Sequence, residues 1–162
     1  MAPPRPSWRL IAAGRMRAGP EAELFDRYAS RLSPPLALVE VPEARGSAAE
    51  ILRREGAAIA AALDARDLVV ALDSGGLAES SDGFARRLAA WRGQGRPLAF
   101  LIGGAEGLDA PLITRAAHVL SLGPPTWPHL LARALLTEQL YRAQSIAAGH
   151  PYHRARARAR VP

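Results

Sequence analysis

The sequence contains no cysteine and no lysine, so all 21 of its basic residues are arginine. Without cysteine the chain has no disulfide, no thiolate nucleophile and no zinc site built on thiolates. Without lysine it has no P-loop lysine, no Schiff-base lysine and no lysine general base. Long apolar runs are also missing: the stretch at residues 10–13 is too short for a signal peptide, and no run approaches the length of a membrane span. We therefore expect a cytoplasmic protein that does not enter a membrane.

The composition is that of one globular domain. Of the 162 residues, 49% are hydrophobic and 22% are charged, which is not the balance of a disordered chain. A chain of this length buries about two-thirds of the surface of its unfolded state. Its core therefore needs no disulfide or metal to hold it.

Positive charge is concentrated at both ends of the chain. Residues 1–20 hold four arginines and residues 139–162 hold five, and neither segment contains an acidic residue. The segment between them holds 12 arginines and 15 acidic residues, so the net charge of +6 comes from the ends. Cationic ends attract polyanions by counterion release, which favours a nucleic-acid partner. For a charge cluster alone, a solvated tail is an equal alternative.

Short apolar segments alternate with helical patterns from end to end. The apolar segments predict strands at residues 8–13, 36–41, 68–72, 98–102 and 119–122. Apolar residues at helical spacing predict helices at residues 21–32, 47–64, 84–91, 111–116 and 129–148. A capping box, Ser47 with Glu50, opens the second of these helices. Apolar strands that alternate with helices indicate an α/β fold with a parallel sheet covered by helices.

Three loops of unusual composition follow strands of this sheet. They are residues 73–76 (DSGG), 103–107 (GGAEG) and 122–127 (LGPPTW). Ligands bind beyond the carboxyl ends of the strands in such sheets, so the three loops together indicate a binding site. The glycine pair lets backbone amides approach a ligand, and the proline pair makes a rigid loop that offers carbonyl groups to an adenine edge. Taken singly, the glycine pair is explained better by a tight turn than by a ligand-binding role. For the proline loop, a plain connector and a ligand-binding role are equally good explanations.

The polar residues of the C-terminal part favour RNA rather than a metal. Four histidines without cysteine make a poor ligand set, and His118, at the start of the last predicted strand, is expected to be a hydrogen-bonded core or edge residue. Glu138 and Arg142 stand four residues apart on the last helix and can pair on one face. The segment at residues 151–154 (PYHR) joins a stacking ring, an acid–base group and a cation, which suits RNA bases and phosphates.

These segments together resemble the ribosomal large-subunit RNA methyltransferase H family. The resemblance rests on residues 98–107 (LAFLIGGAEG), 126–129 (TWPH), 133–146 (RALLTEQLYRAQSI) and 151–153 (PYH). It extends from about Trp8 to Arg154, and the joint spacing of the motifs is specific, unlike any single one. On this basis the chain is divided into an N-terminal extension at residues 1–7, one methyltransferase domain at 8–154 and a basic C-terminal extension at 155–162.

The resemblance implies a SPOUT-class α/β fold with a C-terminal trefoil knot, in a homodimer. It also implies the use of S-adenosyl-L-methionine, with no metal, to methylate N3 of a pseudouridine in 23S rRNA. By position, the cofactor contacts fall on Leu72, Gly103, Leu122, Gly123, Pro124, Pro125, Thr126 and Trp127. We expect His153 to be the base or a proton relay, with Tyr152 as its stacking or hydrogen-bonding partner. Arg142 and Arg154 are expected to hold RNA phosphates.

Two other functions fit parts of the sequence. A basic RNA-binding module without catalysis would explain the charged ends, but pure binding does not require three special loops at the strand ends. A small α/β enzyme using another nucleotide would explain the loops, but the sequence lacks both lysine and the glycine-rich fingerprints of such enzymes. The methyltransferase interpretation accounts for both features.

Overall fold

Five strands and five helices alternate along residues 7–153, the part of the chain that the structure, a computed structural model, describes. In chain order they are β1 (Trp8–Ala13), α1 (Pro20–Ala29), β2 (Leu36–Val41), α2 (Ala48–Ala62), β3 (Leu68–Ala78), α3 (Ser81–Gly93), β4 (Leu98–Ile102), α4 (Ala110–Arg115), β5 (His118–Ser121) and α5 (His129–Ala147), followed by a 3-10 turn, η1 (Pro151–His153). The strands form one sheet in the order β2-β1-β4-β3-β5, and every pair is parallel. The predicted α/β class with a parallel sheet is confirmed.

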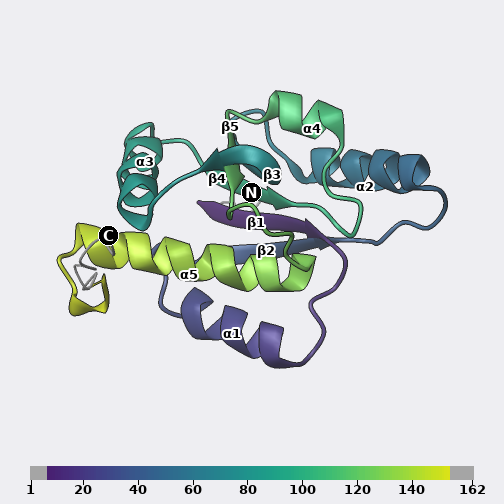
Figure 1. The fold of residues 1–162 in the computed structure, drawn as a ribbon. Helices are drawn as coiled ribbons and strands as arrows, with labels where there is room; N and C mark the ends of the chain where they lie inside the picture. The colour runs from purple at the N-terminus through teal and green to yellow at the C-terminus, as the bar shows by residue number, and fades with distance from the viewer. Residues whose placement is uncertain (1–6, 154–162) are drawn as a thin grey trace, which may run out of the picture.

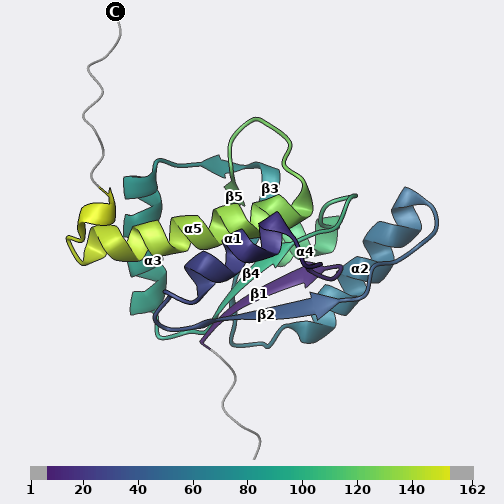
Figure 2. The ribbon, with the colours of Figure 1, turned by 90° about the horizontal axis from the view of Figure 1, so that it is seen from below.

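Helices cover both faces of the sheet, which gives the molecule three layers. Figure 1 shows α1 and α5 below the sheet, α2 and α4 above it, and α3 at one end. The view in Figure 2 shows α1 and α5 side by side across the lower face. Because α5 runs antiparallel to the strands, its first turn lies at their carboxyl edge and its last turn at their amino edge (Figures 1 and 2).

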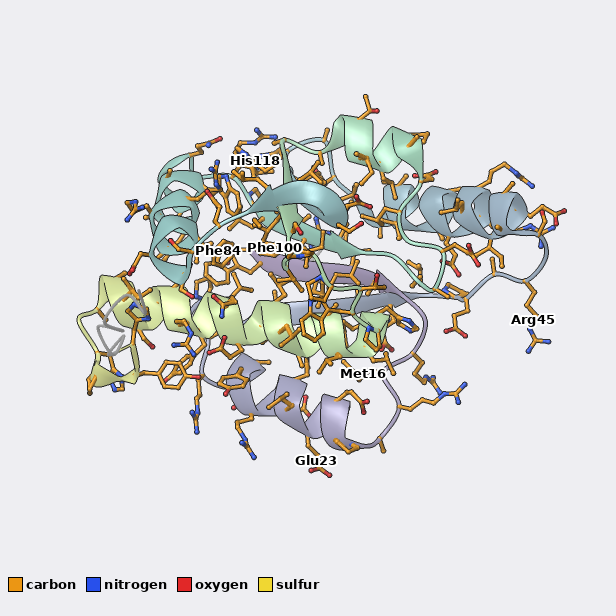
Figure 3. The ribbon with its side chains drawn as sticks, in the orientation of Figure 1. Met16, Glu23, Arg45, Phe84, Phe100 and His118 are labelled. Carbon is orange, nitrogen blue, oxygen red and sulfur yellow. The ribbon has the colours of Figure 1, made fainter. Side chains whose placement is uncertain are left out.

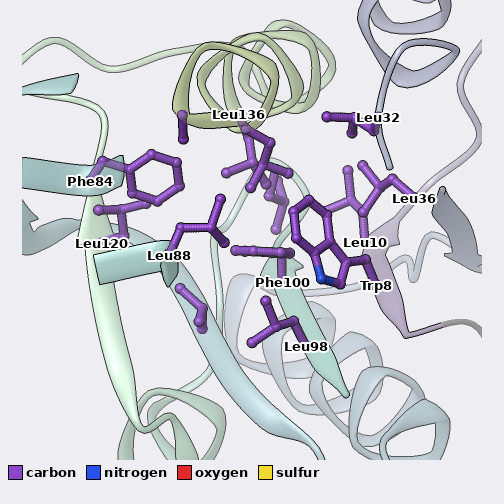
Figure 4. Close-up of a cluster of buried hydrophobic side chains, with 14 of the residues drawn as sticks. Trp8, Leu10, Leu32, Leu36, Phe84, Leu88, Leu98, Phe100, Leu120 and Leu136 are labelled. Atoms are coloured by element: carbon purple, nitrogen blue, oxygen red, sulfur yellow. The ribbon is translucent and has the colours of Figure 1, made fainter. Parts of the chain in front are cut away.

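Alternate residues of the central strands fill two separate cores. Leu10 and Phe100 point to the larger one, between the sheet and helices α1, α3 and α5 (Figure 4). Phe84 of α3 enters the same core, whereas Arg45, ahead of α2, extends into solvent (Figure 3). Ile11 faces the smaller core under α2 and α4. Strands buried on both faces are what continuous apolar segments predict.

Three of the five helices described, α2, α3 and α4, begin at a side-chain cap. Ser47 and Glu50 form the predicted capping box at the start of α2. The same role is played at α3 by Ser80, whose hydroxyl accepts a hydrogen bond from Gly83 N, and at α4 by Asp109, which accepts one from Leu112 N. These caps fix the ends of the connections that follow β3 and β4.

The loop expected at residues 73–76 is instead an irregular part of a longer strand. β3 continues to Ala78, and both Leu72 and Leu77 pair with Leu120 of β5, with the intervening residues bulged out of the ladder. A Cβ on Gly76 would lie 2.7 Å from the Val119 carbonyl oxygen, so glycine alone allows this crossing of β5. The prediction that the strand ends at Leu72 is wrong. The second pairing was missed because it depends on a strand more than 40 residues away.

Candidate active site

One cavity lies where the irregular part of β3 and the segments after β4 and β5 meet at the carboxyl edge of the sheet. It encloses about 200 Å³ and is bounded on one side by the start of α5. Seven of the eight residues expected to contact a cofactor line it: Leu72, Gly103, Leu122, Gly123, Pro125, Thr126 and Trp127. The eighth, Pro124, is exposed and is not part of the lining. The fold thus brings three segments that are distant in the sequence to one site.

The loop after β4 folds back on itself. Gly107 N donates a hydrogen bond to the Gly104 carbonyl at 3.1 Å, and Gly107 has a φ of +81°, which favours glycine. A Cβ on Gly103 would lie 2.1 Å from the Gly107 carbonyl oxygen, so no side chain fits there. The glycine pair is therefore a tight turn that also presents bare backbone to the cavity.

A buried carboxylate supports this loop from behind. Glu55 of α2 is 4% exposed, and its Oε1 accepts a hydrogen bond from Ala44 N at 3.1 Å. Its Oε2 has no hydrogen-bond partner among residues 7–153 and lies against Gly104, where an added Cβ would come within 2.8 Å of it. Sequence reasoning missed Glu55. The available signal was an acidic residue between Leu52 and Ile59, on the apolar face of its helix.

The loop between β5 and α5 is held by its own groups. Ser121 Oγ accepts a hydrogen bond from Gly123 N at 3.1 Å, and Trp127 Nε1 donates to the Leu122 carbonyl at 3.2 Å. Gly123 has a φ of +102°, so the chain turns sharply there. The Trp127 ring, 39% exposed, lies at the mouth of the cavity that it lines.

The first turns of α5 carry a histidine into the cavity and an arginine into the core. His129 lines the cavity, and burial, followed by the positive charge of Arg133, lowers its pKa. The Arg133 guanidinium is fully buried; Nη2 donates to the carbonyls of Ala13 at 2.6 Å and Gly14 at 3.0 Å, and Nη1 lies 3.3 Å from Glu40. Arg133 thereby ties the start of α5 to the carboxyl end of β1.

The other end of α5 holds the Tyr-His motif. The Tyr152 hydroxyl donates to Glu138 Oε1 at 2.9 Å and lies 3.2 Å from the Tyr28 hydroxyl, and its ring meets Tyr141 edge-on at 4.8 Å. Arg142 forms the predicted ion pair with Glu138 and lies over the Tyr152 ring at 5.0 Å. Burial, then hydrogen bonds to Tyr28 and Glu138, raise the pKa of Tyr152. The motif is docked on α1 and α5.

His153 points to the first turn of α3. Its Nε2 lies 3.2 Å from Asp82 Oδ1, and its Nδ1 is buried without a hydrogen-bond partner among the described residues. An Asp on one ring nitrogen is the arrangement that fixes the tautomer of a histidine. Arg154, the second residue expected to hold phosphate, lies outside the described residues.

The cavity and the Tyr-His motif lie at opposite ends of α5. A helix of 19 residues is about 27 Å long between its end residues, at 1.5 Å per residue. Within one chain, therefore, His153 does not meet the cavity that Gly103 and Trp127 line. Among residues 7–153, no three His, Asp or Glu side chains gather to hold a metal, and no helix is long and apolar enough to cross a membrane.

Comparison with known proteins identifies the family of the chain. The sequence model of a family described as "Predicted SPOUT methyltransferase" matches residues 7–153. A Gluconacetobacter diazotrophicus protein named ribosomal RNA large subunit methyltransferase H is 63% identical over 147 residues, covering 91% of this chain and 97% of that protein. The chain belongs to the ribosomal RNA large subunit methyltransferase H family. An Acidiphilium cryptum member with the same name is 60% identical over 155 residues, with 96% and 98% coverage.

A solved structure shares the fold of this family member. A probable methylase family protein from Haemophilus influenzae aligns with a TM-score of 0.56 and 14% identity, over 88% of this chain and 68% of that one. At this identity the likeness describes the fold alone.

Proposed function

We propose that this chain is an rRNA methyltransferase that transfers the methyl group of S-adenosyl-L-methionine to N3 of a pseudouridine in 23S rRNA of the large ribosomal subunit. The observation that carries the proposal is the 63% identity to a relative of that family name, over nearly its whole length. Such an enzyme works in the cytoplasm, where ribosomes are assembled. Residues 8–154 form its single methyltransferase domain, with short extensions at residues 1–7 and 155–162.

The chemistry of the cavity fits the cofactor. Aliphatic side chains of Leu72, Ile102 and Leu122 offer apolar walls to a purine ring, and the bare backbone at Gly103 allows a close approach. Residues 122–127 would hold the adenine edge. When bound there, S-adenosyl-L-methionine supplies an electrophilic methyl group.

The polar residues at the far end of α5 would handle the base and its proton. Methyl transfer requires a base nitrogen held in line with the methyl group, so the protein mainly has to orient the nucleoside. His153 accepts the N3 proton; because its Nε2 faces Asp82 and its Nδ1 is buried, its ring has to turn to do so. Tyr152 has a raised pKa and stays protonated, which suits a stacking and hydrogen-bonding role. Arg142 and Arg154 hold phosphates of the RNA.

A homodimer would bring the two ends together. Because about 27 Å of helix separates the cavity from His153 in one chain, the Tyr-His motif of a second copy would have to complete the site. The family's C-terminal trefoil knot is part of the same proposal. It is supported by the crossing of β5 by residues 73–78, where Leu72 and Leu77 both pair with Leu120.

The test is transfer of labelled methyl from S-adenosyl-L-methionine to ribosomes that lack the modification. Assembled ribosomes and free large subunits are assayed side by side, with mass spectrometry of the nucleosides. Label in N3-methylpseudouridine is the expected result. RNA binding without cofactor affinity would instead favour the non-catalytic RNA-binding module.

Mixed dimers test the shared site. Gly103→Ala and His153→Ala chains, each inactive alone, are unfolded together and refolded. If each site takes its cavity and its histidine from different chains, half of the dimers are mixed, and one of their two sites is intact, so about one quarter of the wild-type activity returns. No recovery, with mixed dimers present, would contradict the shared site.

A further inference from the structure

Three arginines surround a second concave site, at the amino edge of the sheet. This pocket, of about 340 Å³, lies at the first residues of β1 and β4, Trp8 and Leu98. Arg66, Arg92 and Arg96 line it, and no acidic side chain of the described residues belongs to the lining. The pocket is therefore a concentrated positive site, on the edge opposite the candidate cofactor cavity.

Two of these guanidinium groups are already oriented. Arg96 Nε donates to the Arg66 carbonyl at 3.0 Å, and its Nη2 donates to the Asp67 carbonyl at 2.6 Å. The Arg92 guanidinium lies over the Trp8 ring, 5.6 Å from its centroid. Neither contact neutralises the arginine, because carbonyl groups and an indole carry no net charge. A group fixed in advance loses little freedom on binding, so an anion gains more from it than from a mobile side chain.

The charge of this pocket stands out against the rest of the body. Between residues 21 and 138, acidic residues outnumber arginines by 15 to 12, yet three of those arginines share one concavity. The planar guanidinium matches the oxygens of a phosphate group. Phosphate is thus the ligand chemistry that the pocket favours.

Helix α3 connects the pocket to the Tyr-His motif. Asp82 in its first turn contacts His153, and Arg92 in its last turn lines the pocket, about 15 Å further along the helix. Figure 2 shows α3, η1 and the start of β1 at the same end of the molecule. A base at His153 and a phosphate at Arg92 would therefore be only a few nucleotides apart in one RNA strand.

We propose that the pocket lined by Arg66, Arg92 and Arg96 binds backbone phosphates of the RNA substrate and orients it along α3 toward His153. The proposal rests on the proposed function for its RNA. Phosphate contacts of this kind set affinity and register rather than sequence choice. They are expected to act on the affinity for RNA and on KM for the ribosomal substrate, and not on cofactor binding.

The test is the salt dependence of binding to naked 23S rRNA transcript. Arg66→Glu/Arg92→Glu is compared with Arg27→Glu/Arg53→Glu, which makes the same charge change at exposed positions on α1 and α2. We expect the pocket variant to bind about 10- to 100-fold more weakly at low salt, with the slope of log K against log salt reduced by about 2. Its cofactor affinity should equal the wild-type value, whereas the control should bind RNA within about threefold of wild type.

Equal affinity and equal slope in the two double variants would overturn the proposal. If thermal unfolding shows that the glutamate variant is unstable, Arg66→Gln/Arg92→Gln provides the same comparison with a smaller change. KM for large subunits, measured in parallel, separates the two proposals. If the pocket variant transfers methyl groups with an unchanged KM, the RNA-binding role of the pocket is rejected and the methyltransferase function stands. If RNA binding depends on the pocket but no methyl transfer occurs, the methyltransferase function is rejected and the RNA-binding role stands.

Discussion

The contact between Gly103 and Gly107 allows a sharp prediction about the cofactor cavity. In Gly103→Ala the new methyl group would lie 2.1 Å from the Gly107 carbonyl oxygen and 2.2 Å from its carbonyl carbon, well inside van der Waals contact. Both neighbours are backbone, so the turn at residues 104–107 must move by about 1 Å, at a cost of about 1–3 kcal/mol of folding stability. Because this turn lines the cavity, we expect S-adenosyl-L-methionine to bind about 10- to 150-fold more weakly.

A second glycine provides the matched control. Gly93 ends α3, and a Cβ added there would meet nothing within 4 Å. Gly93→Ala should therefore be neutral, or stabilise the chain by about 0.5–1 kcal/mol, and leave the cofactor affinity unchanged. Thermal unfolding and calorimetric titration of the cofactor measure both quantities. A Gly103→Ala protein that binds the cofactor as tightly as Gly93→Ala would refute the placement of the cofactor against this turn.

Three further substitutions test other parts of the chain. His153→Ala should lower turnover by about 100-fold or more while the cofactor affinity stays at the wild-type value; unchanged turnover would reject His153 as the proton acceptor. Arg133→Met removes the buried donor to the carbonyls of Ala13 and Gly14 and should lower the free energy of unfolding, measured in urea, by about 3 kcal/mol. A decrease below about 1 kcal/mol would show that these hydrogen bonds are not needed to hold α5 in place. The folded state lowers the pKa of His129, so the unfolded chain binds a proton at this histidine first as the pH falls, and the stability of the fold should drop below about pH 6.5. In thermal unfolding between about pH 7.5 and 5, His129→Gln should lessen that drop. A drop identical to that of the wild type would contradict the prediction.

The strands were predictable because each is rich in apolar residues, and β2 and β4 are also bounded on both sides by proline or glycine. Their parallel pairing followed from the helices between them, and with it the meeting of three loops at one edge. The boundaries that shifted depend on distant contacts. α1 ends at Ala29 rather than near Leu32, although Leu32 is buried, and β3 continues past its bulge because β5 offers Leu120 to both Leu72 and Leu77.

The candidate site was predictable in its backbone and less so in its side chains. The order of residues in the loop cannot show that Pro125 lines the cavity and that Pro124 does not. Glu55 reaches the glycine turn only because α2 packs behind it, which no local pattern records. The sequence predicts that the Tyr152 ring is available to RNA, but in the structure its hydroxyl contacts the Tyr28 hydroxyl because α1 lies beside α5.

The contacts of Tyr152 determine how far the Tyr-His motif lies from the cavity. Its ring rests on Tyr141 and its hydroxyl on Glu138, both residues of the last half of α5, so the motif is fixed to the far end of that helix. His153 is the next residue, and one residue spans less than 4 Å, far short of the roughly 27 Å back to the cavity. A single chain therefore keeps the cavity and the Tyr-His motif apart. The proposed function accordingly predicts that the Tyr-His motif of one copy lies near the cavity of a second copy.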